Sequence, residues 1–206
     1  SWLDKVLEYP DSKFSTEAMG MSADIAYKGK DYPKALGLYK RMADRALSQE
    51  ERLQAETGAL RSAWMANDQT EIVTTASALL AQSKLAPELE NEARYYRAKA
   101  LLATGKATEA LADLTVLAKD TRNVYGAEAK YLVAQIYFDA GETEKAEKEV
   151  LAYIEVSTPH AYWLARSFVL LSDVYVKLDR KLDAKQYLLS LQQNYHADDD
   201  IEQMIE

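Results

Sequence analysis

Apolar residues recur three and four positions apart along nearly the whole chain, which is the spacing of one face of an α-helix. Short polar stretches with Gly, Asn, Asp or Pro separate these amphipathic segments and are typical of tight turns. Ser48 and Glu51 form a capping-box pattern at one expected helix start. Thr158 and Pro159 predict the start of a long helix that ends near Leu178. The pattern therefore predicts an all-α protein.

One phrase occurs twice in the middle of the chain. Each copy has a small residue, a large residue three positions later, a Gly four positions after that and then an Ala. The copies are Ala98, Leu101, Gly105, Ala110 and Ala134, Tyr137, Gly141, Ala146. They are offset by 36 residues, and a period of this length with two helical patterns indicates a helical-repeat array.

A small or branched residue early in each second helix marks the repeats. These markers are Ala35, Ile72, Ala110, Ala146 and Ala184, spaced by 37, 38, 36 and 38 residues. They predict five helix pairs, at residues 15–47, 48–81, 87–119, 123–156 and 158–194. A half-repeat at residues 1–9 and a helical cap at residues 198–206 are expected to flank the pairs. We therefore expect one continuous array over residues 1–206, and the half-repeat predicts that the chain is a fragment of a longer protein.

The pattern resembles the tetratricopeptide repeat, whose helix pairs have small and aromatic residues at fixed positions and a Gly at the turn. The matching residues are Tyr32, Ala35, Tyr39 and Met42 in the first pair, Ala98, Leu101, Gly105, Ala110 and Leu117 in the third, Ala134, Tyr137, Gly141, Ala146 and Tyr153 in the fourth, and Tyr175, Ala184 and Leu191 in the fifth. The second pair departs from the pattern with Asn67 for the turn Gly and Ile72 for Ala, and the fifth has Asp179 for Gly.

The resemblance implies a right-handed superhelical solenoid of antiparallel helix pairs, with the first helix of each pair lining a concave groove. The long period and the turn Tyr9-Pro10-Asp11-Ser12 resemble bacterial cell-envelope members of the family. That likeness implies a periplasmic or outer-membrane-associated protein. The absence of Cys suits either the periplasm or the cytoplasm, so the cytoplasm stays an alternative.

Composition argues against two classes of partner. The formal charge of −8, with no cluster of Lys and Arg that outweighs its acidic neighbours, argues against nucleic acid, because phosphate binding needs basic residues. No stretch is apolar enough to predict a transmembrane helix. With 48% hydrophobic residues the chain can bury a sizeable core.

Catalytic chemistry is poorly supported by the sequence. His160 and His196 are its two histidines, one at an expected helix start and one in a polar tail, and neither pairs recognisably with a nucleophile. The acidic run Asp198-Asp199-Asp200 lacks the spacing of a calcium loop and fits a helix N-terminus better. No phosphate-binding or dinucleotide-binding motif is present. We expect no enzymatic activity, no metal and no cofactor.

The expected function is a protein-interaction scaffold that binds a partner segment in the groove. The candidate partner-binding residues are the inward-facing aromatic, basic and amide side chains Arg61, Trp64, Tyr95, Lys99, Tyr131 and Gln135. The alternative for the aromatic residues is packing between neighbouring helices. A second hypothesis is a self-assembling module, or a component of an envelope complex that docks through its end helices. It rests on apolar end faces at Trp2, Leu3, Val6 and Ile201 that need cover.

Overall fold

The computed structural model describes Lys5 and residues 15–205 of the chain. The chain divides into two compact units, Ser1–Gly105 and Lys106–Glu206. The half-repeat expected at residues 1–9 lies outside the described residues, apart from Lys5.

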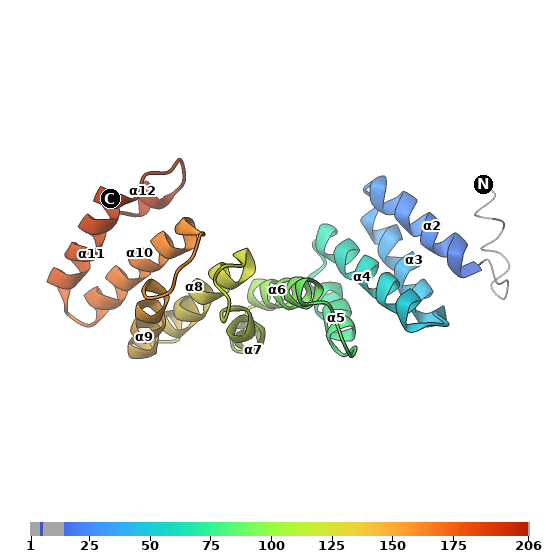
Figure 1. Cartoon of the computed structure of the whole chain (residues 1–206), viewed down its shortest axis with the longest axis horizontal. Coiled ribbons are helices and arrows are strands. Elements are labelled where there is room, and N and C mark those ends of the chain that lie inside the picture. Colours follow the sequence, from blue (N-terminus) through green and yellow to red (C-terminus); the bar gives the residue numbers. More distant parts are fainter. Residues whose placement is uncertain (1–4, 6–14, 206) are drawn as a thin grey trace. The chain divides into compact units, whose positions relative to one another are not determined.

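The first unit contains five described helices, α2 to α6 (Figure 1). They are α2 (Ser15–Lys28), α3 (Tyr32–Arg45), α4 (Gln49–Met65), α5 (Gln69–Leu80) and α6 (Pro87–Ala103). Each packs against the next along the chain, so α3 lies between α2 and α4, and α5 lies between α4 and α6. In the repeat pattern α2, α4 and α6 are the first helices of their pairs.

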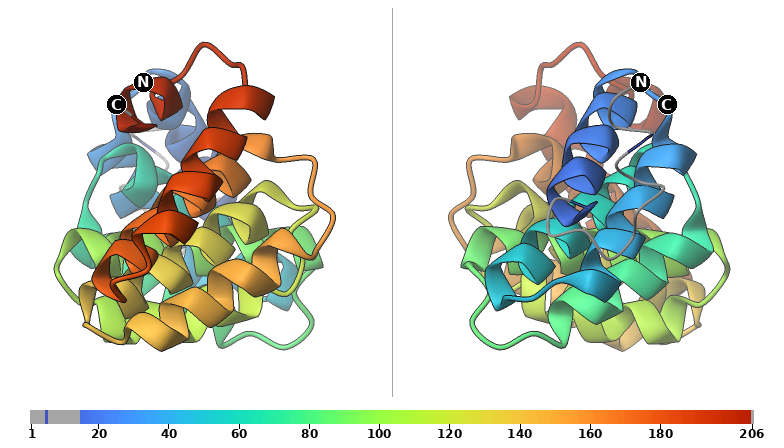
Figure 2. Two further views of the ribbon diagram at one scale, coloured as in Figure 1. Left: turned by 90° about the vertical axis from the view of Figure 1, so that its left-hand side faces the viewer. Right: turned by 90° about the vertical axis from the view of Figure 1, so that its right-hand side faces the viewer.

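The second unit contains six described helices, α7 to α12, which Figure 2 shows from two further sides. They are α7 (Ala107–Leu117), α8 (Val124–Asp139), α9 (Thr143–Ile154), α10 (Ala161–Lys177), α11 (Lys181–Asn194) and α12 (Ile201–Ile205). The first helices α8 and α10 pack on each other as well as on their partners α9 and α11. All regular elements in the described residues are helices, which confirms the predicted all-α fold of helix pairs.

The turn inside each helix pair has the same backbone conformation. One residue there has a positive φ: Lys30 (63°), Asn67 (55°), Gly105 (75°), Gly141 (78°) and Asp179 (58°). Each of them precedes its predicted repeat marker by five positions, the same distance as from Gly105 to Ala110 and from Gly141 to Ala146 in the repeated phrase. A left-handed residue ends a helix by letting the next amide N–H return to a helix carbonyl, as Asp31 N does to Ala26 O at 2.8 Å.

The ends of the helices follow their sequence signals in most places. Ser48 accepts a hydrogen bond from the Glu51 N–H at 3.1 Å, as the capping box predicts. The Glu51 carboxylate accepts a hydrogen bond from the Leu47 N–H at 2.9 Å, although a capping box would place the Ser48 N–H there. The long helix predicted from Thr158 begins only at Ala161.

The late start of α10 has a physical reason. The Thr158 hydroxyl donates a hydrogen bond to the Thr121 carbonyl at 2.8 Å and accepts one from the His160 N–H at 3.1 Å. The hydroxyl is therefore used to join two loops of the second unit, and the helix begins after it.

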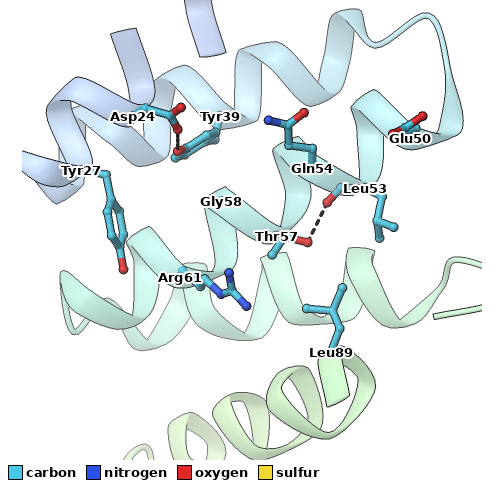
Figure 3. Close-up of a pocket in the computed structure, with 10 residues that line it drawn as sticks. All are labelled: Asp24, Tyr27, Tyr39, Glu50, Leu53, Gln54, Thr57, Gly58, Arg61 and Leu89. Carbon is cyan, nitrogen blue, oxygen red and sulfur yellow. Dashed lines mark hydrogen bonds between the residues drawn. The ribbon is translucent and has the colours of Figure 1, made fainter. Parts of the chain in front are cut away.

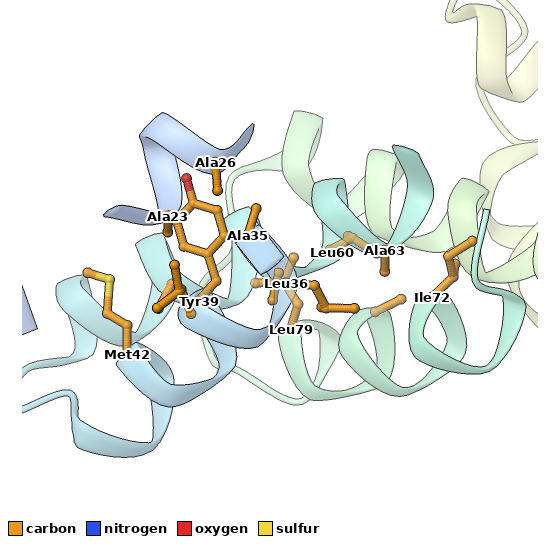
Figure 4. Close-up of a cluster of buried hydrophobic side chains, with 14 of the residues drawn as sticks. Ala23, Ala26, Ala35, Leu36, Tyr39, Met42, Leu60, Ala63, Ile72 and Leu79 are labelled. Carbon is orange, nitrogen blue, oxygen red and sulfur yellow. The ribbon is translucent and has the colours of Figure 1, made fainter. Parts of the chain in front are cut away.

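The core of the first unit is a continuous layer between the paired helices (Figure 4). The marker residues Ala35 and Ile72 are almost completely buried in it, and Leu60 and Leu79 fill the space between α4 and α5. The small side chain of Ala35 lets the neighbouring helix backbones approach closely. The Ala positions of the repeat are therefore packing positions, whereas Gly105 and Gly141 are exposed turn residues with a positive φ.

The core of the second unit includes its last helix. Ile201 of α12 is fully buried against Ala165, Val169 and Leu191. The expectation that an apolar face at Ile201 needs cover from outside the chain is therefore wrong. The other residues of that expectation, Trp2, Leu3 and Val6, lie outside the described residues.

Candidate functional site

A groove in the first unit is lined mainly by first helices (Figure 3). It has a volume of about 600 Å³. Its lining residues are Asp24 and Tyr27 from α2, Tyr39 from α3, Glu50, Leu53, Gln54, Thr57, Gly58 and Arg61 from α4, and Leu89 from α6. The helix α4 contributes most of the wall because positions 50, 54, 57, 58 and 61 recur at helical spacing on one of its faces.

The floor of the groove is built around Tyr39. Its ring is 7% exposed, and its hydroxyl donates a hydrogen bond to Asp24 Oδ1. Burial and the hydrogen bond to the Asp24 carboxylate raise the pKa of the Tyr39 phenol, so it is neutral at physiological pH. Gly58 of α4 lies directly against this ring, because a Cβ at that position would be 2.6 Å from Tyr39 Cε1. The floor is therefore a fixed aromatic surface beside a carboxylate.

Arg61 is paired with Glu92 of α6. Arg61 Nε lies 2.8 Å from Glu92 Oε1 and Arg61 Nη2 lies 2.8 Å from Glu92 Oε2, which is a bidentate pair. The hydrogen bonds to Glu92 raise the pKa of Arg61, although burial acts in the opposite direction. This pair joins two first helices and neutralises the cation of the groove.

Trp64, Tyr95 and Lys99 lie together beyond Arg61. The Trp64 and Tyr95 ring centroids are 6.2 Å apart, and Lys99 Nζ lies 5.7 Å from the Tyr95 ring centroid. Trp64 also stacks on Tyr96, with centroids 4.1 Å apart and planes 4° apart. These side chains are partly buried, and Trp64 and Tyr96 also pack against the core of the first unit.

Tyr131 and Gln135 lie in the second unit, where they contact each other. Tyr131 is 7% exposed and its hydroxyl donates to Gln135 Oε1 at 2.9 Å. Arg166 of α10 lies over the Tyr131 ring at 5.2 Å and donates to its hydroxyl at 3.3 Å. The Tyr131 ring is mainly a packing residue between α8 and α10, while Gln135 stays partly exposed.

The structure thus places four of the six predicted binding residues, Arg61, Trp64, Tyr95 and Lys99, in the first unit. Sequence reasoning missed Leu53 and Leu89, the apolar walls of the groove, and Gly58 in its floor. Leu53 could have been found, because it lies two helical turns before Arg61 on the same face of α4. The role of Gly58 depends on a contact with another helix and leaves no local signal.

Of the two histidines, His160 contacts the backbone of another loop. The Nε2 atom of His160 lies 3.0 Å from the Arg122 carbonyl oxygen, in a loop contact. Asp199 accepts the Ile201 N–H at 3.0 Å and the Tyr195 hydroxyl at 2.5 Å, and Asp200 pairs with Arg166 at 3.1 Å. In residues 15–205, no group of three or more His, Asp or Glu side chains gathers as a metal site, and no helix is both long and apolar enough to cross a membrane.

Asp199 and Asp200 therefore have structural roles. Asp199 caps α12, and Asp200 connects the start of that helix to α10. This is the arrangement expected from an acidic run at a helix N-terminus.

No protein-family model and no curated protein matches the chain. Among solved structures, the TPR-like repeats of a putative kinesin light chain from Podosopora anserina are similar, with a TM-score of 0.57, 16% identity, 89% of this chain covered and 96% of that chain covered. A variant of the same repeats has a TM-score of 0.59 at 15% identity, covering 88% and 96% of the two chains. A tetratricopeptide repeat protein from Parabacteroides merdae has a TM-score of 0.49 at 13% identity, covering 98% and 88%. The helix pairs, their left-handed turn residues and the similarity to the two structures of TPR-like repeats from Podosopora anserina agree: the chain has the fold of a tetratricopeptide repeat protein.

Proposed function

We propose that this chain is a non-enzymatic protein-interaction scaffold, and that the groove of its first unit binds a segment of a partner protein. The single observation that carries the proposal is the groove of about 600 Å³, with walls from α2, α4 and α6. A hollow that spans three first helices is long enough for several side chains of a bound segment. The tetratricopeptide-like fold supports a scaffold role in general.

The groove has the mixture of surfaces that protein partners use. Leu53, Leu89 and the Tyr39 ring offer apolar area, and Gln54 and Thr57 offer hydrogen-bonding groups between them. Apolar contacts supply most of the binding free energy in such sites, and a few polar groups set the orientation of the segment.

The aromatic cluster Trp64–Tyr95–Tyr96 extends this surface along α4 and α6. Trp64 follows Arg61 by three positions and Tyr95 follows Glu92 by three, so both continue the faces that hold the Arg61–Glu92 pair. Trp and Tyr side chains are frequent energetic anchors of protein interfaces. We propose that Trp64, Tyr95 and Lys99 contact the same partner, next to the groove.

Tyr131 and Gln135 remain predicted partner contacts of the second unit. Gln135 Nε2 donates a hydrogen bond to Asp139 Oδ1 at 2.8 Å. Tyr131, Gln135 and Asp139 therefore form a chain of hydrogen bonds along α8. The cell-envelope location also stays a prediction from the sequence. Docking through the last helix loses its basis, because Ile201 is buried within the chain. Docking through the N-terminal face at Trp2, Leu3 and Val6 stays a prediction from the sequence.

The proposal is tested with the whole chain and a displayed library of random peptides. Peptides that bind the chain are measured again on two variants, Gln54→Trp and Ala78→Trp. Gln54 is exposed and lines the groove, so an indole there fills the space without disturbing the core. Ala78 is exposed on the second helix α5 and serves as the matched control for adding an indole to a helix surface.

The expected result is a loss of binding of about tenfold or more in Gln54→Trp, with little change in Ala78→Trp, because a filled groove excludes the partner segment. Peptides that bind both variants as well as the original chain contradict the proposal.

A further inference from the structure

The groove of the first unit is acidic. Asp24 and Glu50 line it, and a second hollow of about 430 Å³ continues from Asp24 and Gln54 toward Glu17 and Glu51. Asp24 and Glu50 are both exposed. One carboxylate oxygen of Asp24, Oδ1, accepts a hydrogen bond from the Tyr39 hydroxyl. A carboxylate has room for several donors, so Asp24 can accept a further hydrogen bond from a bound segment.

The positive charge that lines the groove is already compensated. Arg61 is the one Lys or Arg among the described residues that line these two hollows, and both of its bonds go to Glu92. A pair with two parallel hydrogen bonds has little net charge to offer a ligand. The carboxylates of Asp24 and Glu50 are therefore not balanced by a cation of the groove.

The acidic groups lie beside apolar ones. In Figure 3, Asp24 and Glu50 lie toward different ends of the groove, with Gln54 and Leu53 between them and Leu89 on the opposite wall. A bound segment that matches both the apolar and the acidic residues of the groove needs an apolar side chain to contact Leu53 and Leu89. It also needs basic side chains to pair with the carboxylates of Asp24 and Glu50. An acidic segment would place like charges together, which costs binding free energy.

We propose that the groove selects a partner segment in which Lys or Arg residues flank an apolar residue. The inference rests on the proposed function and adds the chemistry of the partner to it. The long stems of Lys and Arg can lie along the apolar wall while their charged ends reach Asp24 and Glu50. The formal charge of the whole chain, −8, attracts a basic segment before contact is made.

The test uses the same displayed library of random peptides and the whole chain. We expect the selected peptides to be enriched in Lys and Arg within a few positions of an apolar residue. Binding is then measured on the double variant Asp24→Asn with Glu50→Gln. Asn keeps a carbonyl oxygen that can accept the Tyr39 hydroxyl, so the floor of the groove is preserved.

The matched control is the double variant Asp44→Asn with Glu109→Gln. It changes the net charge of the chain by the same amount, Asp44 is exposed on the second helix α3, and Glu109 is in the first turn of α7 as Glu50 is in the first turn of α4. We expect binding to weaken roughly tenfold in the groove variant and less than about twofold in the control. The loss in the groove variant should also shrink at high salt, because salt screens exposed charges.

The outcomes separate the two claims. Peptides that lose binding in Gln54→Trp but carry no excess of Lys or Arg overturn the charge inference and leave the scaffold proposal standing. Equal losses in the groove variant and the control also overturn it, since they indicate general attraction only. Peptides that are unaffected by Gln54→Trp overturn the scaffold proposal itself.

Discussion

The ring of Tyr39 lies so close to Gly58 that a Cβ on Gly58 would be 2.6 Å from Tyr39 Cε1. The contact joins the second helix α3 to the next first helix, α4, at the floor of the groove. It also holds the Tyr39 hydroxyl against Asp24 of α2. One small residue thus allows three helices to meet around a single aromatic side chain.

The first prediction concerns this contact. In Gly58→Ala the added methyl group forces the buried Tyr39 ring to move and weakens its bond to Asp24. We expect a loss of about 1–3 kcal/mol in the free energy of unfolding, measured with urea. The control is Gly37→Ala on α3, where a Cβ meets nothing within 4 Å. Alanine should stabilise that helix by up to about 1 kcal/mol. Stabilisation by both substitutions would show that the ring does not depend on Gly58.

The second prediction concerns the turn inside each pair. Lys30 has a φ of 63° and Gly141 a φ of 78°, a conformation that costs a residue with a Cβ about 1 kcal/mol. Lys30→Gly is therefore expected to raise the free energy of unfolding, by about 0.5–1 kcal/mol, and Gly141→Ala to lower it by a similar amount. Thermal unfolding monitored by circular dichroism measures both changes. A lower stability for Lys30→Gly would mean that the Lys side chain has a role that outweighs the strain of its backbone.

The third prediction concerns alkaline pH. Burial, followed by the nearby Tyr187 and Glu147, raises the pKa of Tyr175 from 10.0 to about 12. The pKa of the folded state is above that of the unfolded chain, so the stabilisation is fully present below pH 10 and is lost as the pH rises toward 12. We expect the free energy of unfolding to fall by about 2 kcal/mol from this residue over that range.

Tyr175→Phe is the control for the alkaline transition, because it keeps the ring and removes the ionising group. The variant should unfold with a shallower dependence on pH between 10 and 12. The ring should keep its contact with Arg180, whose guanidinium carbon lies 4.2 Å from the ring centroid. An unchanged pH profile would show that other groups control alkaline unfolding.

The fourth prediction uses the Arg61–Glu92 pair to change the charge of the groove in two directions. Arg61→Gln leaves the Glu92 carboxylate without its cation and should strengthen binding of a basic peptide several-fold. Glu92→Gln leaves the Arg61 guanidinium uncompensated and should weaken it by a similar factor. Affinities of the same peptide for the two variants, measured at low salt, check the opposite signs. Changes of the same sign would mean that the pair acts through structure and not through charge.

The repeat register could be predicted from sequence because it depends on local chemistry. Turn residues that tolerate a positive φ, such as Gly105, Gly141 and Asn67, leave a visible signal at a fixed distance from a buried marker. The start of α10 was misplaced because Thr158 bonds to Thr121, 37 residues earlier, which no local pattern reveals.

The candidate site was predictable in part for the same reason. Helical spacing placed Arg61 and Trp64 on one face of α4, and Tyr95 and Lys99 on one face of α6. It could not show that Arg61 is engaged by Glu92, nor that Tyr39 reaches over Gly58 to form the floor. These contacts join different helices, and they determine which charges of the groove remain for a partner.

The central claim is that a partner segment lies on the first helices of the first unit. It is tested most directly by photo-cross-linking, with a selected peptide that carries a diazirine side chain next to its apolar residue. The account predicts that cross-links map to the groove wall of α4, at Leu53, Gln54 and Thr57, and to Leu89 of α6. Cross-links that map mainly to the second helices α3 and α5 would contradict it. Cross-links that form at the same positions and with the same yield in Gln54→Trp as in the original chain would also contradict it.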